Sequence, residues 1–261
     1  MTIDHKNIYN TLEVSKDYET RDYLDPAEKA VIDELGGSLS LMNMLDMGVG
    51  GGRTTKYFAP LVNSYIGADY AHAMIAACKR KYGDTYSFIE CDVRKMDMFE
   101  ANSFDFVFFS YNGMDSFSHK DRQSALKEIR RVLRSGGYFY FSSHNLDWQG
   151  LENIFSLRNH KFSRKIDDIA RHALKIVRLK LLNRSLAMNT RIKKIRANRK
   201  GHIYDNSLNG KACVYYISLD EQLEQLADHG FTDVQTFGLD GKKTSDPKYL
   251  NSGGWIYYLC K

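Results

Sequence analysis

Short apolar runs alternate with amphipathic stretches along the first 145 residues of the chain. The apolar runs predict strands over residues 41–47, 65–69, 86–90, 103–110 and 138–143. The intervening stretches predict helices over residues 53–60, 71–82 and 118–134. The run 103–110 is almost uninterrupted, as expected for a strand that is buried on both faces. This alternation is typical of an α/β fold with a Rossmann-like, mainly parallel sheet and helices on both faces.

The chain ahead of this alternation, residues 1–36, is predicted to form an arm and a helix. Asp25 as a cap and Pro26 at the first helical position predict a helix that ends at the Gly36-Gly37 pair. Before that helix, residues 1–23 hold several tyrosines, which indicates an arm or lid that folds over the body.

The alternating pattern lapses between residues 146 and 212. This segment is helix-like, basic and poor in strand signal, so we interpret it as a helical insertion after the fifth strand. Strand and helix character returns over residues 213–217, 219–229, 234–237 and 255–260. The expected organisation is therefore a body made of residues 37–145 and 213–261, interrupted by the insertion.

Length and composition are those of an ordinary soluble protein. The 261 residues suffice for one sizeable domain with an insertion, and 43% of them are hydrophobic and 26% charged. The start has no apolar signal-peptide core, and no run approaches the roughly 18 apolar residues of a membrane span. The four cysteines have no short paired spacing, so we expect neither zinc nor a disulfide framework, and a cytoplasmic location.

The net charge of +5 hides a strong asymmetry along the chain. Residues 156–200 contain fifteen Lys and Arg against two acids, Asp167 and Asp168, whereas the remaining chain contains 22 Lys and Arg against 30 acids. The insertion is therefore a cationic segment attached to an acidic body. It allows four interpretations: a lid with a solvated charged face, a site for an anionic small substrate, an RNA surface, or a membrane-surface helix.

The most informative motif follows the first predicted strand, in the run MLDMGVGGGRTTK at residues 44–56. Glycines at 48, 50, 51 and 52 lead directly into a helix-like stretch. Glycine allows positive φ and lets a ligand approach main-chain N–H groups. A strand, a glycine-rich turn and a helix start together form a nucleotide-binding corner. Asp69, 21 positions beyond Gly48, ends the second strand, where a carboxylate can accept both hydroxyls of a ribose.

The loop is neither the dinucleotide fingerprint G-x-G-x-x-G nor a phosphate loop, because no Gly-Lys-Ser/Thr follows. It resembles the first motif of class I S-adenosylmethionine-dependent methyltransferases, acid-x-G-x-G-x-G, which is met by Asp46, Gly48, Gly50 and Gly52. Asp69 meets their second-strand acid. The resemblance covers residues 40–143 well and 213–261 moderately, and does not cover the insertion. It implies S-adenosylmethionine as cofactor and a C-terminal antiparallel hairpin that closes the sheet.

The resemblance also implies roles for residues around the cofactor. Its ribose is expected at Asp69, and Tyr70 and Met74 follow that strand, although Met74 is nearly as easily explained as a buried helix residue. Its adenine is expected to meet Asp92 through the amino group and Val93 through the backbone N–H, the alternative for Asp92 being a turn-forming role.

At the amino-acid end of the cofactor, the N-terminal arm is expected to supply the Tyr18 hydroxyl to the carboxylate. Arg53, just past the glycine loop, is expected to pair with the same group. Ser110 ends the fourth strand on the side that faces the sulfonium. The plainer interpretation of the arm is that its tyrosines only pack on the body.

The sequence gives weaker evidence for the residues that contact the methyl acceptor. Tyr111 and Asn112 follow the fourth strand and are expected to orient an acceptor, although the Asn-Pro-Pro-aromatic motif of many nucleobase and amide methyltransferases is missing. His144 follows the fifth strand and is a candidate general base, with Tyr111 as a second catalytic candidate. Further acceptor contacts are expected from Tyr9, His119 and Asn145. A hydrogen-bonded structural histidine and ordinary turn residues remain open as alternatives.

These features predict a methyltransferase that acts on a nitrogen or oxygen of a small metabolite, such as a sugar or specialised metabolite, with a slight preference for nitrogen. No metal is expected, nucleic acid is an unlikely partner, and the protein is expected to be a monomer or homodimer. The alternatives are an RNA methyltransferase that uses the basic insertion and a cofactor-binding protein without activity.

Overall fold

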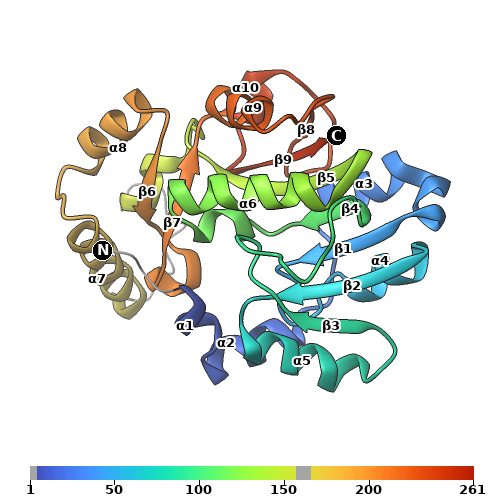
Figure 1. The fold of residues 1–261 in the computed structure, drawn as a ribbon. Helices are drawn as coiled ribbons and strands as arrows, with labels where there is room; N and C mark the ends of the chain where they lie inside the picture. The colour runs from blue at the N-terminus through green and yellow to red at the C-terminus, as the bar shows by residue number, and fades with distance from the viewer. Residues whose placement is uncertain (1–4, 157–165) are drawn as a thin grey trace.

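In the computed structural model, residues 5–156 and 166–261 are described, and their strands form one mixed sheet (Figure 1). The main strand order is β3-β2-β1-β4-β5-β7-β6. The five strands before the insertion all pair in parallel, and they are β1 (Asn43–Met47), β2 (Ser64–Asp69), β3 (Ser87–Glu90), β4 (Phe104–Phe109) and β5 (Leu133–Asn145). The prediction of a Rossmann-like, mainly parallel α/β sheet is confirmed.

The C-terminal part closes the sheet with antiparallel strands. Strand β8 (Gln235–Phe237) pairs with β9 (Trp255–Cys260), and β9 runs antiparallel to β5 from Phe139 to His144. The expected C-terminal hairpin is therefore present. Because β9 lies along β5, Trp255 is placed opposite His144, at the carboxyl end of the parallel strands.

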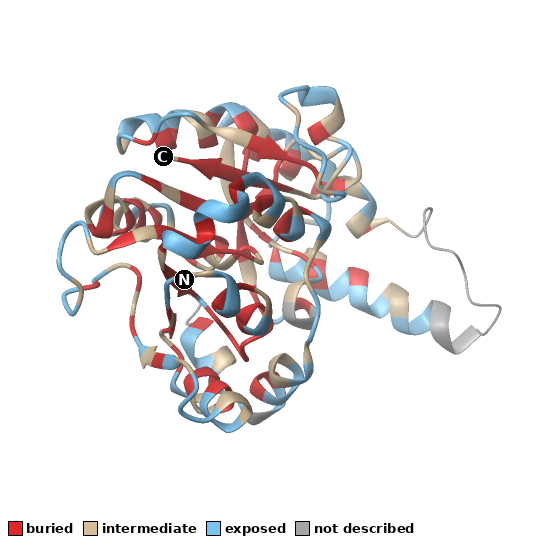
Figure 2. Cartoon of the chain, turned by 90° about the vertical axis from the view of Figure 1, so that its right-hand side faces the viewer, coloured by how far each residue is buried: buried red, intermediate tan, exposed pale blue. Residues whose placement is uncertain are grey.

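Helices cover both faces of the sheet, and each face has its own apolar core. Helices α3 (Pro26–Leu35), α4 (Thr55–Phe58) and α5 (His72–Tyr82) pack into one core, and α6 (His119–Val132) and α9 (Leu219–Asp228) into the other. The side chains of β4 alternate between them, with Phe106 and Phe108 on the first side and Val107 and Phe109 on the second. Figure 2 shows this buried sheet between exposed helix surfaces.

Two element boundaries differ from the sequence prediction. Helix α6 ends at Val132 rather than Arg134, because Leu133 is already extended and opens β5. The Gly136-Gly137 pair therefore lies inside β5, where the pairing with β4 shifts register and Gly136 adopts a φ of 75°. Helix α4 is also shorter than expected, because a 3-10 turn (Ala59–Leu61) that contains Pro60 follows it.

The insertion contains more sheet than its sequence indicated. It comprises 3-10 turns at Leu151–Phe155 and Ser207–Gly210, helices α7 (Ile166–Leu182) and α8 (Met188–Ala197), and strand β6 (Lys200–Tyr204). Strand β6 pairs antiparallel with β7 (Cys213–Ile217), so the prediction of a strand-poor segment was wrong there. Only Ile203 of β6 is buried, and its pairing with β7 rather than an apolar pattern defines the strand.

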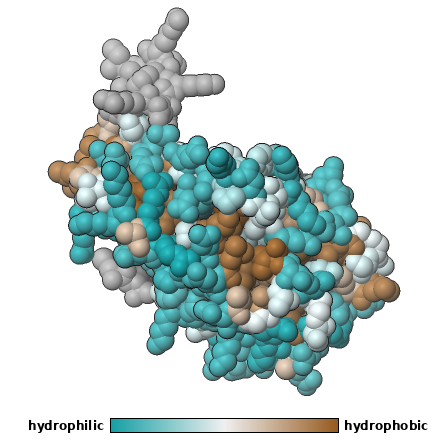
Figure 3. All heavy atoms as spheres, turned by 90° about the horizontal axis from the view of Figure 1, so that it is seen from above, coloured by the Kyte–Doolittle hydropathy of each residue, from teal (hydrophilic) through white to brown (hydrophobic). Residues whose placement is uncertain are grey.

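The insertion and the arm meet at the carboxyl edge of the sheet, where Lys211 pairs with Glu13. In Figure 2, α7 projects from the body and is largely exposed, and Figure 3 shows hydrophobic side chains beside the grey segment on a mostly hydrophilic surface. The arm forms helices α1 (His5–Tyr9) and α2 (Leu12–Thr20), and α2 packs against α5. In the described part of the chain, no helix has both the length and the apolarity to cross a membrane.

The packing of β4 makes a first prediction. Phe106 is fully buried against Phe58 and Phe108, so Phe106→Ala should lower the free energy of unfolding by about 3–5 kcal/mol. Leu61→Ala is a matched control, because Leu61 is 40% exposed and its truncation should cost far less. Urea denaturation of both variants measures the difference. An equal, small loss for both would contradict the assignment of β4 to the centre of the core.

Candidate active site

The glycine loop connects β1 to α4 at the carboxyl edge of the sheet. Gly48, Gly50 and Gly52 have φ values of 67°, 56° and 77°, which favour glycine strongly. A Cβ at Gly48 would lie 2.4 Å from the Phe109 ring, and one at Gly50 would lie 3.1 Å from the Tyr18 ring. The absence of side chains therefore leaves a cradle of main chain that larger residues would fill.

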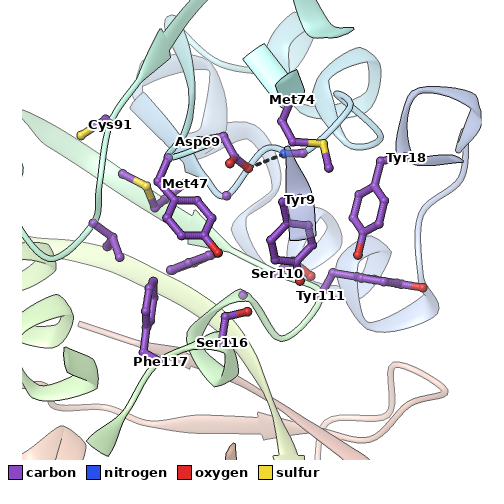
Figure 4. A pocket seen from close by; sticks show the side chains of 16 residues that line it. Tyr9, Tyr18, Met47, Asp69, Met74, Cys91, Ser110, Tyr111, Ser116 and Phe117 are labelled. Atoms are coloured by element: carbon purple, nitrogen blue, oxygen red, sulfur yellow. Dashed lines mark hydrogen bonds between the residues drawn. The ribbon is translucent and has the colours of Figure 1, made fainter. Parts of the chain in front are cut away.

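The loop forms one wall of a cavity with about 570 Å³ of space not filled by atoms (Figure 4). Strand ends, the arm and the start of α5 supply its other walls. The lining residues are Tyr9, Tyr18, Met47, Gly48, Gly50, Asp69, Tyr70, Met74, Cys91, Val93, Phe109, Ser110, Tyr111, Gly113, Ser116 and Phe117. This cavity thus brings together nine of the residues that the sequence proposed as cofactor or acceptor contacts. The catalytic candidate Tyr111 also lines it.

Asp69 lies at the centre of this cavity wall. Its Oδ2 accepts a hydrogen bond from the Gly50 N–H at 3.1 Å, and its Oδ1 accepts one from the Ala71 N–H at 2.8 Å. Burial raises the pKa of Asp69 to about 6 despite these donors. A carboxylate has about four acceptor positions, so two remain that can accept ribose hydroxyls.

Beyond Asp69 the cavity becomes an apolar slot. Met74 and Val93 are almost fully buried in its walls, and the Tyr70 and Phe117 rings meet edge to face at 6.3 Å. Such a slot fits a flat heteroaromatic ring such as adenine. Together with the glycine cradle and the acceptor positions of Asp69, it fits S-adenosylmethionine.

Asp92 does not line this cavity. Its carboxylate accepts hydrogen bonds from Arg94, the shortest at 2.6 Å, and this arginine lowers its pKa although burial opposes the shift. The ion pair would have to rearrange before Asp92 bonded to an adenine amino group, so that role stays a prediction. Val93, the next residue, does line the cavity.

The arm closes the cavity from above with two tyrosines (Figure 4). The rings of Tyr9 and Tyr18 meet edge to face with centroids 5.8 Å apart. Burial raises the pKa of Tyr9 to about 12, so its hydroxyl stays protonated at neutral pH. Tyr18 lies directly over Gly50, in the position expected of a residue that contacts the amino-acid end of the cofactor.

Arg53 forms an ion pair within the protein, whereas the sequence suggested that it binds the carboxylate of the cofactor. Its guanidinium makes a bidentate pair with the fully buried Glu28, at 2.6 and 2.5 Å, and also donates to the Tyr23 carbonyl. Glu28 further accepts from the Ser110 hydroxyl at 2.5 Å. Both Arg53 and Ser110 therefore stabilise a buried carboxylate, which also forms a capping box with Asp25 at the start of α3.

Among the described residues, Arg21 is a second cation beside the glycine loop. Its guanidinium carbon lies 4.0 Å from the Tyr18 ring centroid, and its recorded ion pair is with the exposed Asp17 at 2.7 Å. Arg21 lines a smaller hollow at the loop together with Asp46 and Gly50. We therefore expect Arg21, rather than Arg53, to pair with the carboxylate of the cofactor.

Asp46, the acid of the motif, supports the loop from beneath. Its Oδ2 accepts hydrogen bonds from the Thr54 and Tyr65 hydroxyls, each at 2.7 Å, and burial raises its pKa to about 6. Gly52 contributes through its carbonyl, which accepts from Tyr82 at 2.8 Å. These contacts fix the shape of the loop, and Asp46 reaches the hollow beside it.

A second cavity of about 1410 Å³ adjoins the first and shares Tyr9, Tyr18, Tyr111 and Ser116 with it. The arm, the end of β4, the end of β5, the insertion and β9 all contribute to it. Its other lining residues are Glu13, Val14, Asp17, Arg21, Asn112, His144, Asn206, Ser207, Lys211, Ala212, Val214 and Trp255. Its position beyond β4 and β5 makes it the candidate acceptor site.

The backbone is strained at the border between the two cavities. Tyr111 and Asn112 are consecutive non-glycine residues with φ values of 55° and 58°. The Asn112 N–H donates to the Ser142 hydroxyl at 2.8 Å, while its buried Oδ1 has no hydrogen-bond partner in the structure. Strained backbone of this kind concentrates at functional sites, and the Asn112 amide is available to a ligand.

His144 lines the second cavity and is held from behind by the fully buried Asp115. Asp115 Oδ2 accepts from the His144 backbone N–H at 2.6 Å and from the ring Nδ1–H at 2.7 Å. Asp115 Oδ1 accepts from Arg122 at 2.8 Å, which balances the buried charge. The ring Nε2 lies on the other side, 4.0 Å from Asp205 of the insertion.

Two expected acceptor contacts lie outside both cavities. The Asn145 side-chain amide donates to the Leu250 and Gly253 carbonyls and so ties β5 to the loop before β9. His119 forms a hydrogen bond with the Tyr215 hydroxyl at 2.9 Å.

The sequence analysis did not identify Glu28 and Asp115 as site residues. Both are acids in a helix or turn, and the sequence does not indicate which buried residue such an acid will contact in the fold.

Comparison with known families supports the cofactor site. A protein-family model with the description "Methyltransferase domain" matches residues 45–141 of this chain. These residues extend from the glycine loop to β5. No curated protein sequence matches the chain significantly. Among the described residues, no group of three or more His, Cys, Asp or Glu is arranged to hold a metal ion.

Several solved structures share the fold. A Thermotoga maritima S-adenosylmethionine-dependent methyltransferase, described as a possible histamine N-methyltransferase, is 16% identical and has a TM-score of 0.57, with 100% of this chain and 99% of that one covered. A Mesorhizobium loti S-adenosylmethionine-dependent methyltransferase is 15% identical, with a TM-score of 0.58 and coverages of 90% and 97%. A third is 1,6-didemethyltoxoflavin-N1-methyltransferase from Burkholderia thailandensis, with bound 1,6-didemethyltoxoflavin and S-adenosylhomocysteine. It is 14% identical, with a TM-score of 0.56 and coverages of 98% and 84%.

The raised pKa of Asp69 predicts pH-dependent binding of S-adenosylhomocysteine. Only the ionised carboxylate accepts both ribose hydroxyls, so affinity should fall about tenfold between pH 7 and pH 5, through the pKa of about 6. Because the folded pKa lies above the unfolded value, the same group makes the ligand-free protein less stable as pH rises through this window. Calorimetric titration measures the affinity. Asp69→Asn should bind weakly at both pH values, and a parent-like profile in this variant would contradict the assignment.

Two substitutions distinguish the roles of the two arginines beside the glycine loop. Arg21→Gln should weaken S-adenosylhomocysteine binding about tenfold or more, because a charge-assisted hydrogen bond is lost, and should leave stability nearly unchanged. Arg53→Gln should instead lower the free energy of unfolding by about 3–5 kcal/mol, because Glu28 is left buried and unpaired. Calorimetry and urea denaturation distinguish the two effects. Unchanged affinity in Arg21→Gln would show that another group binds the carboxylate.

Proposed function

Because this chain is a class I S-adenosylmethionine-dependent methyltransferase, we propose that it transfers a methyl group to a nitrogen or oxygen of a small metabolite. The observation that carries the proposal is His144, which is oriented by Asp115 and faces a cavity that adjoins the cofactor cavity. An acceptor in that cavity would reach both the cofactor and a base. We propose an acceptor that loses a proton, namely a hydroxyl or an ammonium group.

S-adenosylmethionine supplies a methyl group that is already activated on a sulfonium, so the protein's task is to position the acceptor and exclude water. Tyr111 and Asn112 lie at the border of the two cavities and are proposed to align the acceptor. Orientation of this kind can supply roughly 7–11 kcal/mol of a barrier. Tyr9 and Tyr18 cover the junction and keep water out.

His144 is proposed to take the proton. Asp115 holds the ring as the Nδ1–H tautomer, so Nε2 carries the lone pair that accepts the acceptor's proton. Asp205, 4.0 Å from Nε2, then stabilises the imidazolium that forms. The slight preference for nitrogen that the sequence suggested rested on the scarcity of bases, and an oriented His144 serves hydroxyl acceptors equally well.

We propose that residues 146–212 act as the lid on the acceptor side, with residues 37–145 and 213–261 as the cofactor-binding body and residues 1–36 as the arm. The insertion supports this role because it supplies Asn206, Ser207 and Lys211 to the second cavity. Lys211 also pairs with Glu13 of the arm at 3.2 Å, so the lid and the arm meet across the site.

The proposal is tested by screening amine and hydroxyl metabolites with S-adenosylmethionine labelled at the methyl group. For an acceptor so found, His144→Ala should lower kcat by about 10²–10⁴-fold, because the base is lost, while S-adenosylhomocysteine affinity stays unchanged. His119→Ala is the matched control, because that histidine lies outside both cavities. Parent-like turnover of His144→Ala across pH would exclude it as the base, and labelling of RNA alone would contradict the small-metabolite acceptor.

A further inference from the structure

A third depression lies between the arm, the start of α6 and the insertion, with about 1710 Å³ of space not filled by atoms. It shares Ser116 with the cofactor cavity and with the second cavity. It shares Tyr70 and Phe117 with the apolar slot of the cofactor cavity. We call it the basic groove, because Lys6, Arg94, Arg184 and Arg191 line it.

The charges in the basic groove are not balanced. Asp121 is the only acid among its described lining residues, and it is already 3.5 Å from Arg94. Lys6 pairs with Glu90, and Arg94 pairs with Asp92. For Arg184 and Arg191, the described part of the chain provides no ion-pair partner. Within the part of the chain that the structure describes, no acid compensates these two guanidinium groups.

Arg191 is incompletely hydrogen-bonded in the structure. It lies on α8 and is partly buried, and one Nη group donates to the His202 carbonyl at a long 3.4 Å. Its Nε–H is buried without a hydrogen-bond partner in the structure. A buried charged donor left without an acceptor is costly, and each such case requires an explanation. An anion in the groove would accept from the Nη groups, and contact with the buried Nε–H would require the side chain to shift.

Arg184 gives independent evidence. It follows the last residues of α7, where the Ser185 N–H bonds to the Lys180 carbonyl and the Arg184 N–H bonds to the Leu181 carbonyl. This is a Schellman motif, whose left-handed position is usually glycine. Arg184 occupies it with a φ of 51°. An arginine held in a conformation that disfavours it points to a function for its side chain.

We propose that the basic groove binds a phosphate group of a small phosphorylated metabolite, held by Arg184 and Arg191. Guanidinium groups bind phosphate oxygens through paired N–H donors, which matches two arginines that line the groove and have no ion-pair partner among the described residues. The site lies outside both the cofactor and the acceptor cavities. The proposal therefore does not depend on which molecule is methylated.

Titration calorimetry of the full chain with pyrophosphate and with inorganic phosphate tests the proposal without cofactor or activity. Both should bind, and pyrophosphate more tightly. Arg184→Gly should weaken binding about tenfold or more, because one charged contact is lost, while its Tm equals or exceeds that of the parent, because glycine suits the left-handed position. Arg191→Gln should weaken binding by a similar factor.

Arg178→Gln is the matched control, because Arg178 is an exposed arginine on α7 outside the groove and carries the same charge. Its binding should be unchanged. An equal loss in Arg178→Gln would show a diffuse charge effect and overturn the site, as would parent-like binding in Arg184→Gly or no binding of either probe. A single-stranded RNA that binds with a steep salt dependence, and displaces pyrophosphate far more effectively than AMP does, would overturn the small-metabolite assignment.

Discussion

The arrangement of the site depends on one buried carboxylate, Glu28. It lies at the first turn of α3, pairs with Arg53 of the glycine loop and accepts a hydrogen bond from Ser110 at the end of β4. Three segments far apart in sequence are thereby fixed to one another beneath the cofactor cavity. A buried ion pair of this kind contributes little net stability, but it strongly disfavours any arrangement that leaves one partner unpaired. Its effect is to hold the loop and the end of β4 in one relative position.

The cofactor side of the site was largely predictable because its signals are local. The spacing from Asp46 to Gly52 and the acid at Asp69 belong to consecutive elements, and the parallel sheet brings their ends together. The partners of Arg53 and His144 were not predictable, because Glu28 and Asp115 meet them only in the folded chain. Strand β6 was missed for a related reason, since its pairing with β7 defines it and a single buried side chain leaves no pattern.

The two sides of the site have different origins. The cofactor cavity is built mainly by the ends of β1, β2 and β4, which belong to the part that matches the methyltransferase domain. The second cavity takes residues from the arm, the insertion and β9. The three solved structures compared above are 14–16% identical to this chain. One fold can serve different substrates when the residues that select the substrate lie in segments added to a common body.

Tyr9 and Tyr18 line both cavities, and this shared wall has a kinetic consequence. Neither compartment can be opened at the arm without exposing the other, so exchange of the two ligands is coupled to one movement. When the arm moves, both ligand sites are exposed together, and we expect the rate of this movement to affect the exchange of both ligands.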